Sequence, residues 1–381
     1  MRGPRYAAEA LSERFRRDAG SGRRRTDPLR LRQLEAPSVP EGLTESFDQL
    51  CRFAAGPVCV AVSGGGDSLA LLLIAADWAR KSGRSVLAFT VDHGLRPEAA
   101  DEARFVAGAA ARLGVAHRML RWQAPRAGQA KARMARHDLL SAAAREAGSV
   151  MILTAHTEDD QAETFLIRAR AGSGWYGLAG IQPLSLSPAE THGVPVFLAR
   201  PLLAIPRAAL RDLLRANGQD WVEDPSNDNP AYERVRMRRL LAADPALRTR
   251  VLAIQDRLQL LRQVQDRALA RWLSEEVETR PDGTLRAPLP LPPGERGDRA
   301  LAALITLASG RTRPVRSDAL SRLTHRIAHP DTLRPATLGG AAVWIKNGNL
   351  KAVAEHKLPP EQVNAIPARL SAMVTACLGE M

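Results

Sequence analysis

From about residue 43 onward, the apolar positions of this chain alternate between two periods. Short apolar runs typical of buried strands alternate with longer segments in which apolar residues recur every three or four positions, as in helices. Strands are expected at 58–62, 85–91, 115–120, 149–154 and 195–199, and helices at 68–80, 98–113, 130–147, 158–170 and 206–217. This alternation predicts an α/β fold in which a parallel sheet carries helices on both faces.

The pattern changes beyond residue 236. Long helical runs cover 236–274, a proline-rich linker follows at 288–293, and another helix is expected at 298–308. Two apolar strands flank Asn347-Gly348, a dipeptide that favours a type I′ hairpin. We therefore expect three parts: an arginine-rich N-terminal extension at 1–42, a catalytic domain at 43–235, and a smaller, mostly helical C-terminal domain at 236–381 with a small β-hairpin.

Composition narrows the class of protein. The chain has 381 residues and a net charge of +13, carried mostly by arginine. Such a charge favours a polyanionic partner, although a general coding bias toward arginine is the alternative explanation. Residues 1–36 contain ten arginines and five acids with few large apolar residues, which predicts disorder.

We expect neither a membrane-spanning segment nor disulfide bonds. No apolar run approaches the roughly 20 residues that span a bilayer. The three cysteines, Cys51, Cys59 and Cys377, form no C-x-x-C motif and indicate free thiols in a reducing compartment. We therefore expect a cytoplasmic protein that has no membrane partner.

A glycine-rich turn follows the strand at 58–62 directly. Its residues, expected to bind ATP, are Ser63, Gly64, Gly65, Gly66, Asp67 and Ser68. Glycines let backbone N–H groups approach an anion, and the following helix N-terminus favours negative charge. Asp67 would repel phosphate unless a cation lies between them, which predicts Mg²⁺. The loop lacks the lysine of a Walker P-loop and the spacing of a dinucleotide fingerprint.

Two further strands end in polar residues. Asp92 and His93 follow the strand at 85–91 and are expected to contact the adenine or ribose. His156 and Asp160 follow the strand at 149–154. Because ligands bind at the carboxyl ends of parallel strands, we expect all these residues at one edge of the sheet. Asp160 is a second candidate Mg²⁺ ligand, and we expect it to matter for chemistry more than for folding.

Arginines recur along the rest of this half of the chain. Arg200 ends the strand at 195–199, while Arg207, Arg211 and Arg215 recur every four residues, as a phosphate-binding or merely solvated helix face would. Arg234 and Arg238 belong to a later cluster. A glycine-rich segment at 171–180 predicts a mobile loop, whose Trp175 or Tyr176 either stacks on a base or anchors in the core.

Six sequence motifs follow one another along the chain. They are Ser-Gly-Gly-Gly-Asp-Ser, Val-Asp-His-Gly-Leu-Arg, Ala-His-x-x-Asp-Asp-Gln-Ala-Glu-Thr, Gly-Ser-Gly-x-x-Gly-Leu, Arg-Pro-Leu-Leu and Trp-x-x-Asp-Pro-Ser-Asn. Over roughly residues 55–240 this series resembles the bacterial tRNA(Ile)-lysidine synthetase family, within the PP-loop superfamily of N-type ATP pyrophosphatases. The chain departs from the family pattern at Thr157, Ala171 and Val235.

The resemblance implies a ligase that modifies the wobble cytidine of a tRNA(Ile) with a CAU anticodon. ATP adenylates the C2 carbonyl oxygen with loss of pyrophosphate, and free L-lysine then displaces AMP to give lysidine. The cofactors implied are ATP and Mg²⁺. The same resemblance implies that the catalytic residues are Asp67, His156 and Asp160. It also implies that the two aspartates contact the metal. The residues expected to contact tRNA or lysine are Arg200, Arg207, Arg211, Arg234 and Arg238.

Two alternatives remain open at this point. One is tRNA thiolation, which uses a similar loop but needs persulfide cysteines or an iron–sulfur cluster. The other is a non-catalytic adenine-nucleotide-binding module, which would not require His156 or Asp160. The sequence leaves the oligomeric state open, with a homodimer among the options.

Overall fold

The computed structural model describes residues 42–378, apart from gaps at 53, 55, 93–98, 124–127, 190–193, 224–228, 312–314, 316 and 330–333. Disorder of the N-terminal extension was predicted for residues 1–42, which lie outside the described part except for Gly42. The predicted ATP ligand His93 also lies outside it. The described residues belong to one compact unit, Ser38–Met381.

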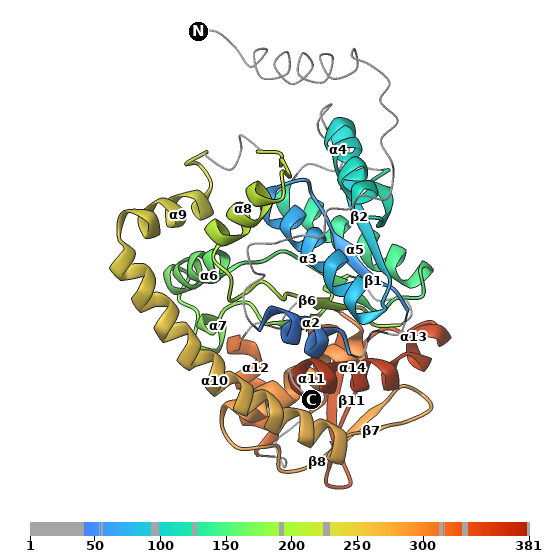
Figure 1. The fold of residues 1–381 in the computed structure, drawn as a ribbon. Coiled ribbons are helices and arrows are strands. Elements are labelled where there is room, and N and C mark those ends of the chain that lie inside the picture. The colour runs from blue at the N-terminus through green and yellow to red at the C-terminus, as the bar shows by residue number, and fades with distance from the viewer. Residues whose placement is uncertain are drawn as a thin grey trace, which may run out of the picture. The chain divides into compact units, whose positions relative to one another are not determined.

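A six-stranded sheet forms the centre of the N-terminal half (Figure 1), in the order β3-β2-β1-β4-β6-β5. The strands are β1 (Val58–Ala61), β2 (Val86–Asp92), β3 (Ala116–Arg121), β4 (Met151–Leu153), β5 (Leu184–Leu186) and β6 (Phe197–Ala199). All neighbours pair in parallel except β5, which runs antiparallel to β6 at the edge. The predicted parallel sheet is confirmed, and the antiparallel edge strand is an addition to it.

Helices cover both faces of this sheet. They are α2 (Leu43–Cys51), α3 (Gly66–Ser82), α4 (Ala99–Arg112), α5 (Gln129–Glu146), α6 (Glu158–Arg170) and α8 (Arg207–Ala216). Val58 and Val60 of β1 join the core beneath α2, α3, α4 and α8, whereas Cys59 between them joins the core beneath α5. The alternation reflects the twofold side-chain period of a strand, so both faces of the sheet are buried.

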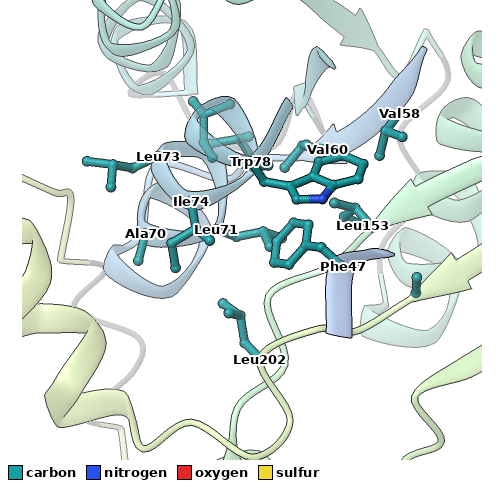
Figure 2. Packing of buried hydrophobic residues seen from close by; sticks show 14 of the residues in the cluster. Phe47, Val58, Val60, Ala70, Leu71, Leu73, Ile74, Trp78, Leu153 and Leu202 are labelled. Atoms are coloured by element: carbon teal, nitrogen blue, oxygen red, sulfur yellow. The ribbon is translucent and has the colours of Figure 1, made fainter. Parts of the chain in front are cut away.

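The helix that follows the glycine-rich turn is held firmly in the larger core. Figure 2 shows Leu71 and Ile74 of α3 close to Phe47 and Trp78, with Leu153 of β4 and Leu202 completing the packing. The rings of Phe47 and Trp78 lie 5.4 Å apart. Because interiors pack at crystal-like density, this core fixes the start of α3, and with it the glycine-rich turn.

A break at Asp244-Pro245 divides the long helical run into α9 (Glu233–Ala243) and α10 (Pro245–Glu276). The Asp244 side chain accepts a hydrogen bond from the Leu247 N–H at 2.9 Å, and proline is tolerated in the first turn that follows. Helix α10 runs past α6 and the short α7 (Trp175–Leu178) to reach α11 (Glu295–Ser309) and α14 (Ile366–Leu378).

The C-terminal part contains a second sheet, with strand order β7-β8-β11-β10-β9. Its strands are β7 (Glu278–Thr279), β8 (Leu285–Pro288), β9 (Ala336–Leu338), β10 (Ala341–Lys346) and β11 (Asn349–Ala354), and its remaining helices are α12 (Ser317–Ile327) and α13 (Pro360–Asn364). Asn347 and Gly348 both have positive φ, 53° and 71°, as a type I′ turn requires. The predicted hairpin is therefore confirmed, within a larger antiparallel sheet. The domain boundary expected near residue 235 stays a prediction.

Among the helices of the described ranges, none combines the length and apolar character needed to cross a membrane.

Candidate active site

The glycine-rich turn is organised by its two serines. The Ser63 N–H donates to Ser68 Oγ at 3.2 Å, and that hydroxyl donates to the Gly65 carbonyl at 2.8 Å. Gly64 has a φ of 89°, which favours glycine, and its carbonyl accepts the Val222 N–H at 2.9 Å. The turn thus precedes the N-terminus of α3, which suits an anion.

Gly66, at the start of α3, faces the ring of Trp221. A Cβ there would lie 3.4 Å from the Trp221 ring. Arg211 and Arg215 of α8 place their guanidinium groups 5.9 and 5.7 Å from the centroid of the same ring. The glycine-rich turn, Trp221 and the exposed face of α8 therefore lie together.

Three carboxylates, Asp67, Asp160 and Glu163, gather beside this turn and are called the acid centre below. Arg207 bridges them, with Nε 2.9 Å from Asp67 Oδ2, Nη2 3.1 Å from Asp160 Oδ1 and Nη1 3.5 Å from Glu163 Oε1. Arg234 Nε and Arg238 Nε lie 2.7 and 2.8 Å from Glu163. The structure thus brings together two predicted site residues, Asp67 in the helix after β1 and Asp160 in the helix after β4.

Burial and charge shape the titration of this centre. Burial raises the pKa of Asp67, and the nearby Arg207 opposes that rise. Burial lowers the pKa of Arg207, but Asp67 and Asp160 outweigh it and leave that pKa raised. Arg207 therefore stays protonated as the counter-ion of the acid centre.

Asp160 has a structural contact as well as a place in the acid centre, and whether it matters for chemistry more than for folding stays a prediction. Its Oδ2 accepts the Thr157 N–H at 2.8 Å and the Thr157 hydroxyl at 3.0 Å, which completes a capping box at the start of α6. Neighbouring Asp159 accepts the Arg207 N–H at 2.7 Å and so caps α8. These contacts join the starts of α6 and α8.

His156 follows β4, as predicted, and its Nδ1 lies 3.1 Å from Thr154 Oγ1. Burial lowers its pKa to about 3, helped by four arginines that include Arg200 and Arg234. The imidazole is therefore neutral at neutral pH and free to accept a proton, although a base of such low pKa is weak. An anion that neutralised the arginines would raise its basicity.

The remaining predicted residues occupy different environments. Asp92 is buried at the end of β2, and its Oδ2 lies 3.5 Å from Arg121 Nε. Arg200 is buried, whereas Arg211 on α8 is half-buried. Arg207 faces the acid centre, so it does not share a solvated stripe with Arg211 and Arg215. Their roles in binding ATP, lysine or tRNA stay predictions.

The acid centre supplies only part of the ligands that Mg²⁺ needs. Within the described ranges, no group of three or more His, Cys, Asp or Glu residues is arranged to hold a metal ion. Mg²⁺, however, is commonly held by one or two carboxylates together with substrate phosphates. Asp67 and Asp160, which share one guanidinium, are oxygen donors of this kind, so the residues fit the ion once phosphates are present.

The glycine-rich segment after α6 anchors rather than exposes its aromatic residues. Trp175 Nε1 donates to Glu295 at 2.7 Å, and the Tyr176 hydroxyl donates to Asp266. The Arg262 guanidinium lies 3.9 Å from the centroid of the Tyr176 ring. These contacts attach α7 to α10 and α11, which favours the anchoring interpretation over base stacking.

Comparisons with known proteins agree with this geometry. The PP-loop domain family matches residues 40–244. The tRNA(Ile)-lysidine synthase of Hyphomonas neptunium is 48% identical over 305 residues, covering 80% of this chain and 83% of that protein. The chain belongs to the tRNA(Ile)-lysidine synthase family. A protein of the same name from Methylobacterium nodulans is 40% identical over 329 residues, covering 81% of this chain and 92% of the relative.

A solved structure gives a weaker likeness. The U34-tRNA thiolase NcsA from Methanococcus maripaludis has a TM-score of 0.44 and 16% identity, covering 57% of this chain and 78% of that one. A likeness of this size bears on neither the reaction nor the substrate.

Sequence reasoning missed part of the site. Glu163 is only 1% exposed and touches three arginines, yet its place in the acidic motif was not given a role. Its position three residues after Asp160 was the available signal, because that spacing puts both on one helix face. Arg133 and Arg136 of α5, which act electrostatically on His156, were also missed. Their motif resembles an ordinary basic helix.

Proposed function

We propose that this protein ligates free L-lysine to C2 of the wobble cytidine of tRNA(Ile) in the cytoplasm, using ATP and releasing AMP and pyrophosphate. The observation that carries the proposal is the convergence of Asp67, Asp160 and Arg207 at the glycine-rich turn. It occurs in a chain that is 48% identical to a tRNA(Ile)-lysidine synthase over most of its length.

In the first step, the C2 carbonyl oxygen of cytidine attacks the α-phosphorus of ATP. A new oxygen–phosphorus bond forms, the bond to the β-phosphate oxygen breaks, and pyrophosphate leaves. We assign the phosphates to the N–H groups of the glycine-rich turn and the start of α3. Mg²⁺, held by Asp67 and Asp160, would neutralise charge on those phosphates.

For the carboxylates to serve the phosphates, Arg207 must give up part of its contact with them. Arg207 lies at the start of α8 with its Nε 2.9 Å from Asp67 Oδ2, beside the glycine-rich turn, so it is well placed to turn toward the phosphates. A guanidinium suits developing phosphate charge because its donors match phosphate oxygens bidentately.

In the second step, the neutral ε-amine of lysine attacks C2. The carbon–nitrogen bond forms, the carbon–oxygen bond to AMP breaks, and the amine loses a proton. His156 is a neutral acceptor near this edge of the sheet, and a phosphate group bound against the arginines that act on it would raise its basicity.

The cysteines argue against thiolation. Burial raises the pKa of Cys51 to about 12 and that of Cys59 to about 11. Burial also raises the pKa of Cys377 to about 12. Sulfur chemistry requires a thiolate, so none of these three thiols is suited to carry a persulfide.

The test is a reaction of the protein with ATP, Mg²⁺, lysine and a CAU-anticodon tRNA(Ile) transcript. We expect AMP and pyrophosphate, and mass spectrometry of the digested tRNA should show a cytidine that has gained lysine and lost water. Formation of ADP, or AMP release without a modified cytidine, would overturn the proposal. A transcript with a non-CAU anticodon serves as the matched control.

A further inference from the structure

Polar side chains recur along the face of α10 that packs on α6 and α7 (Figure 1). Arg248, Gln255 and Arg262 are spaced seven residues apart, which places them on one face of the helix. Arg248 pairs with Glu158 and lies 3.7 Å from Asp159, both in the first turn of α6. Arg262 lies against α7. Gln255, between the two arginines, has no role in the chemistry above.

The side chain of Gln255 ends on Gln161 of α6, and both glutamines are buried. Gln161 Oε1 accepts the Ile181 N–H at 2.8 Å, and its Nε2 donates to the Ile181 carbonyl at 2.8 Å. These two bonds fix which end of the Gln161 amide is oxygen. That oxygen also faces Gln255, whose Nε2 donates to it at 3.1 Å. Gln255 therefore serves here as a hydrogen-bond donor.

The other end of the Gln255 amide is a buried oxygen. Gln255 is 1% exposed, and its Oε1 makes no hydrogen bond within the described part of the chain. An unsatisfied buried acceptor is costly, and a methionine of similar shape would avoid that cost. Packing alone therefore does not account for a glutamine at this position, whereas the hydrogen bond that it donates does.

Gly180 leaves room for this contact. Its φ of 79° favours glycine, and a Cβ on it would lie 1.8 Å from Gln255 Nε2 and 2.5 Å from Gln161 Oε1. The Gly180 carbonyl accepts a hydrogen bond at 2.9 Å from Arg168, which lies on α6 with Gln161. The backbone between α7 and β5 thus contacts both α6 and α10 where the two glutamines meet.

Gln161 connects this contact to the acid centre. It follows Asp160 directly, and its N–H donates to the Thr157 carbonyl at 3.2 Å, within the turn that the capping box closes. Asp160 and Glu163 face Arg207 from the same part of α6. A displacement of this turn would carry both carboxylates with it, because the backbone of a helical turn moves as one unit.

We propose that Gln255 is a positioning residue for the acid centre. Its hydrogen bond to Gln161 holds the start of α6 in place, so that Asp160 stays aligned with the glycine-rich turn while the adenylyl group is transferred. The inference rests on the proposed function and adds a residue of α10 to that reaction. A small misplacement of a reacting group lowers the rate even when substrate still binds.

The test replaces Gln255 with methionine, which keeps the unbranched shape and removes both polar atoms. Pyrophosphate release from ATP and tRNA, followed in a single turnover without lysine, reports the first step. We expect the maximal rate constant to fall about tenfold, the effect of one lost hydrogen bond. The ATP concentration that gives half of this rate should change by less than about twofold, because binding and positioning are separate. The midpoint of urea unfolding should not fall, since the unsatisfied oxygen is removed as well.

Gln263→Met is the matched control. Gln263 is half-buried on the same helix, about two turns beyond Gln255. We expect this variant to keep the wild-type rate constant and the wild-type unfolding midpoint. Gln255→Leu, which also lacks polar atoms, provides the same test should Gln255→Met fail to fold.

A double-mutant cycle separates positioning of the acid centre from an independent effect. If Gln255 acts through Asp160, Gln255→Met should slow the Asp160→Asn variant by less than about twofold, whereas independent effects multiply. Effects that multiply would overturn the proposal, as would a wild-type rate of pyrophosphate release in Gln255→Met. A wild-type protein that releases no pyrophosphate from ATP and tRNA would instead refute the proposed function.

Discussion

The acid centre and the arginines that act on His156 use the same residue type in opposite ways. In the acid centre, Arg207, Arg234 and Arg238 are paired with carboxylates, and the pKa of Arg207 is raised. Near His156, burial and then the neighbouring Arg133 lower the pKa values of Arg136 and Arg200. An arginine that already has its counter-ion positions other groups, whereas one that lacks a counter-ion is available to bind an anion.

The strongest test of this difference is Asp67→Asn, which removes one charge from the acid centre while keeping its shape. We expect pyrophosphate release to fall by about 10³-fold, because Asp67 reaches the phosphates through Mg²⁺ and its loss removes a positioned charge. Filter-binding affinity for tRNA should change little. Near-normal turnover would show that Asp67 only pairs with Arg207.

Glu163→Gln tests whether the acid centre also holds the fold together. Glu163 is 1% exposed and pairs with three arginines, so the variant leaves those charges uncompensated. We expect the free energy of unfolding to fall by about 3 kcal/mol. Urea denaturation measures it, with Glu223→Gln at an exposed position as the control. A loss no larger than that of the control would refute this structural role.

Asp160→Asn should affect both chemistry and stability. Lysidine formation should drop by about 10²-fold. The capping box is weakened as well, so we expect a loss of about 1 kcal/mol in the free energy of unfolding. Thr157→Ala removes the cap and one hydrogen bond to Asp160 but keeps every charge of the acid centre, so it should reproduce mainly the loss of stability. If Asp160→Asn melts like the wild type, the capping contact contributes nothing.

His156 should make the stability of the protein depend on pH. The pKa of His156 is lowered to about 3 in the folded protein, so the unfolded chain binds the proton more readily. Stability from this residue is present above about pH 6.5 and is lost as pH falls toward 3. Between pH 6 and pH 5 we expect its share of the loss to be about 1 kcal/mol, measured as the difference from His156→Gln. Equal slopes for the two proteins would contradict the buried, neutral state.

The smallest effect concerns the exposed arginines, which belong to neither group. Arg211 and Arg215 lie over Trp221, with side chains 42% and 62% exposed. If they contact tRNA phosphates, replacing both with Gln should reduce the slope of log affinity against log salt by about 1.5–2. Arg80→Gln with Lys81→Gln, on α3, removes equal charge as a control. Unchanged slopes would leave Arg211 and Arg215 as a solvated face.

Local patterns were sufficient for much of the fold. The apolar runs around Val60 and Ile152 and the helical period after Asp67 specified the parallel sheet, because strand and helix periods arise from backbone geometry alone. The same rule placed Asp67 and His156 at strand ends, hence at one edge. Asn347-Gly348 specified its hairpin because few residues adopt positive φ. The antiparallel strand β5 carried no such local signal.

Charge pairing was beyond the reach of sequence patterns. Arg207, Arg211 and Arg215 look equivalent along the helix, yet Arg207 is drawn into the acid centre by three carboxylates from two other elements. Arg133 and Arg136 resemble a solvated basic face until the strand ends bring Arg200 and His156 beside them. Periodicity depends on neighbours within one element, and it therefore places a residue on a face. The pKa and pairing of that residue depend on charges from distant segments, which only packing of the folded chain brings within a few ångströms.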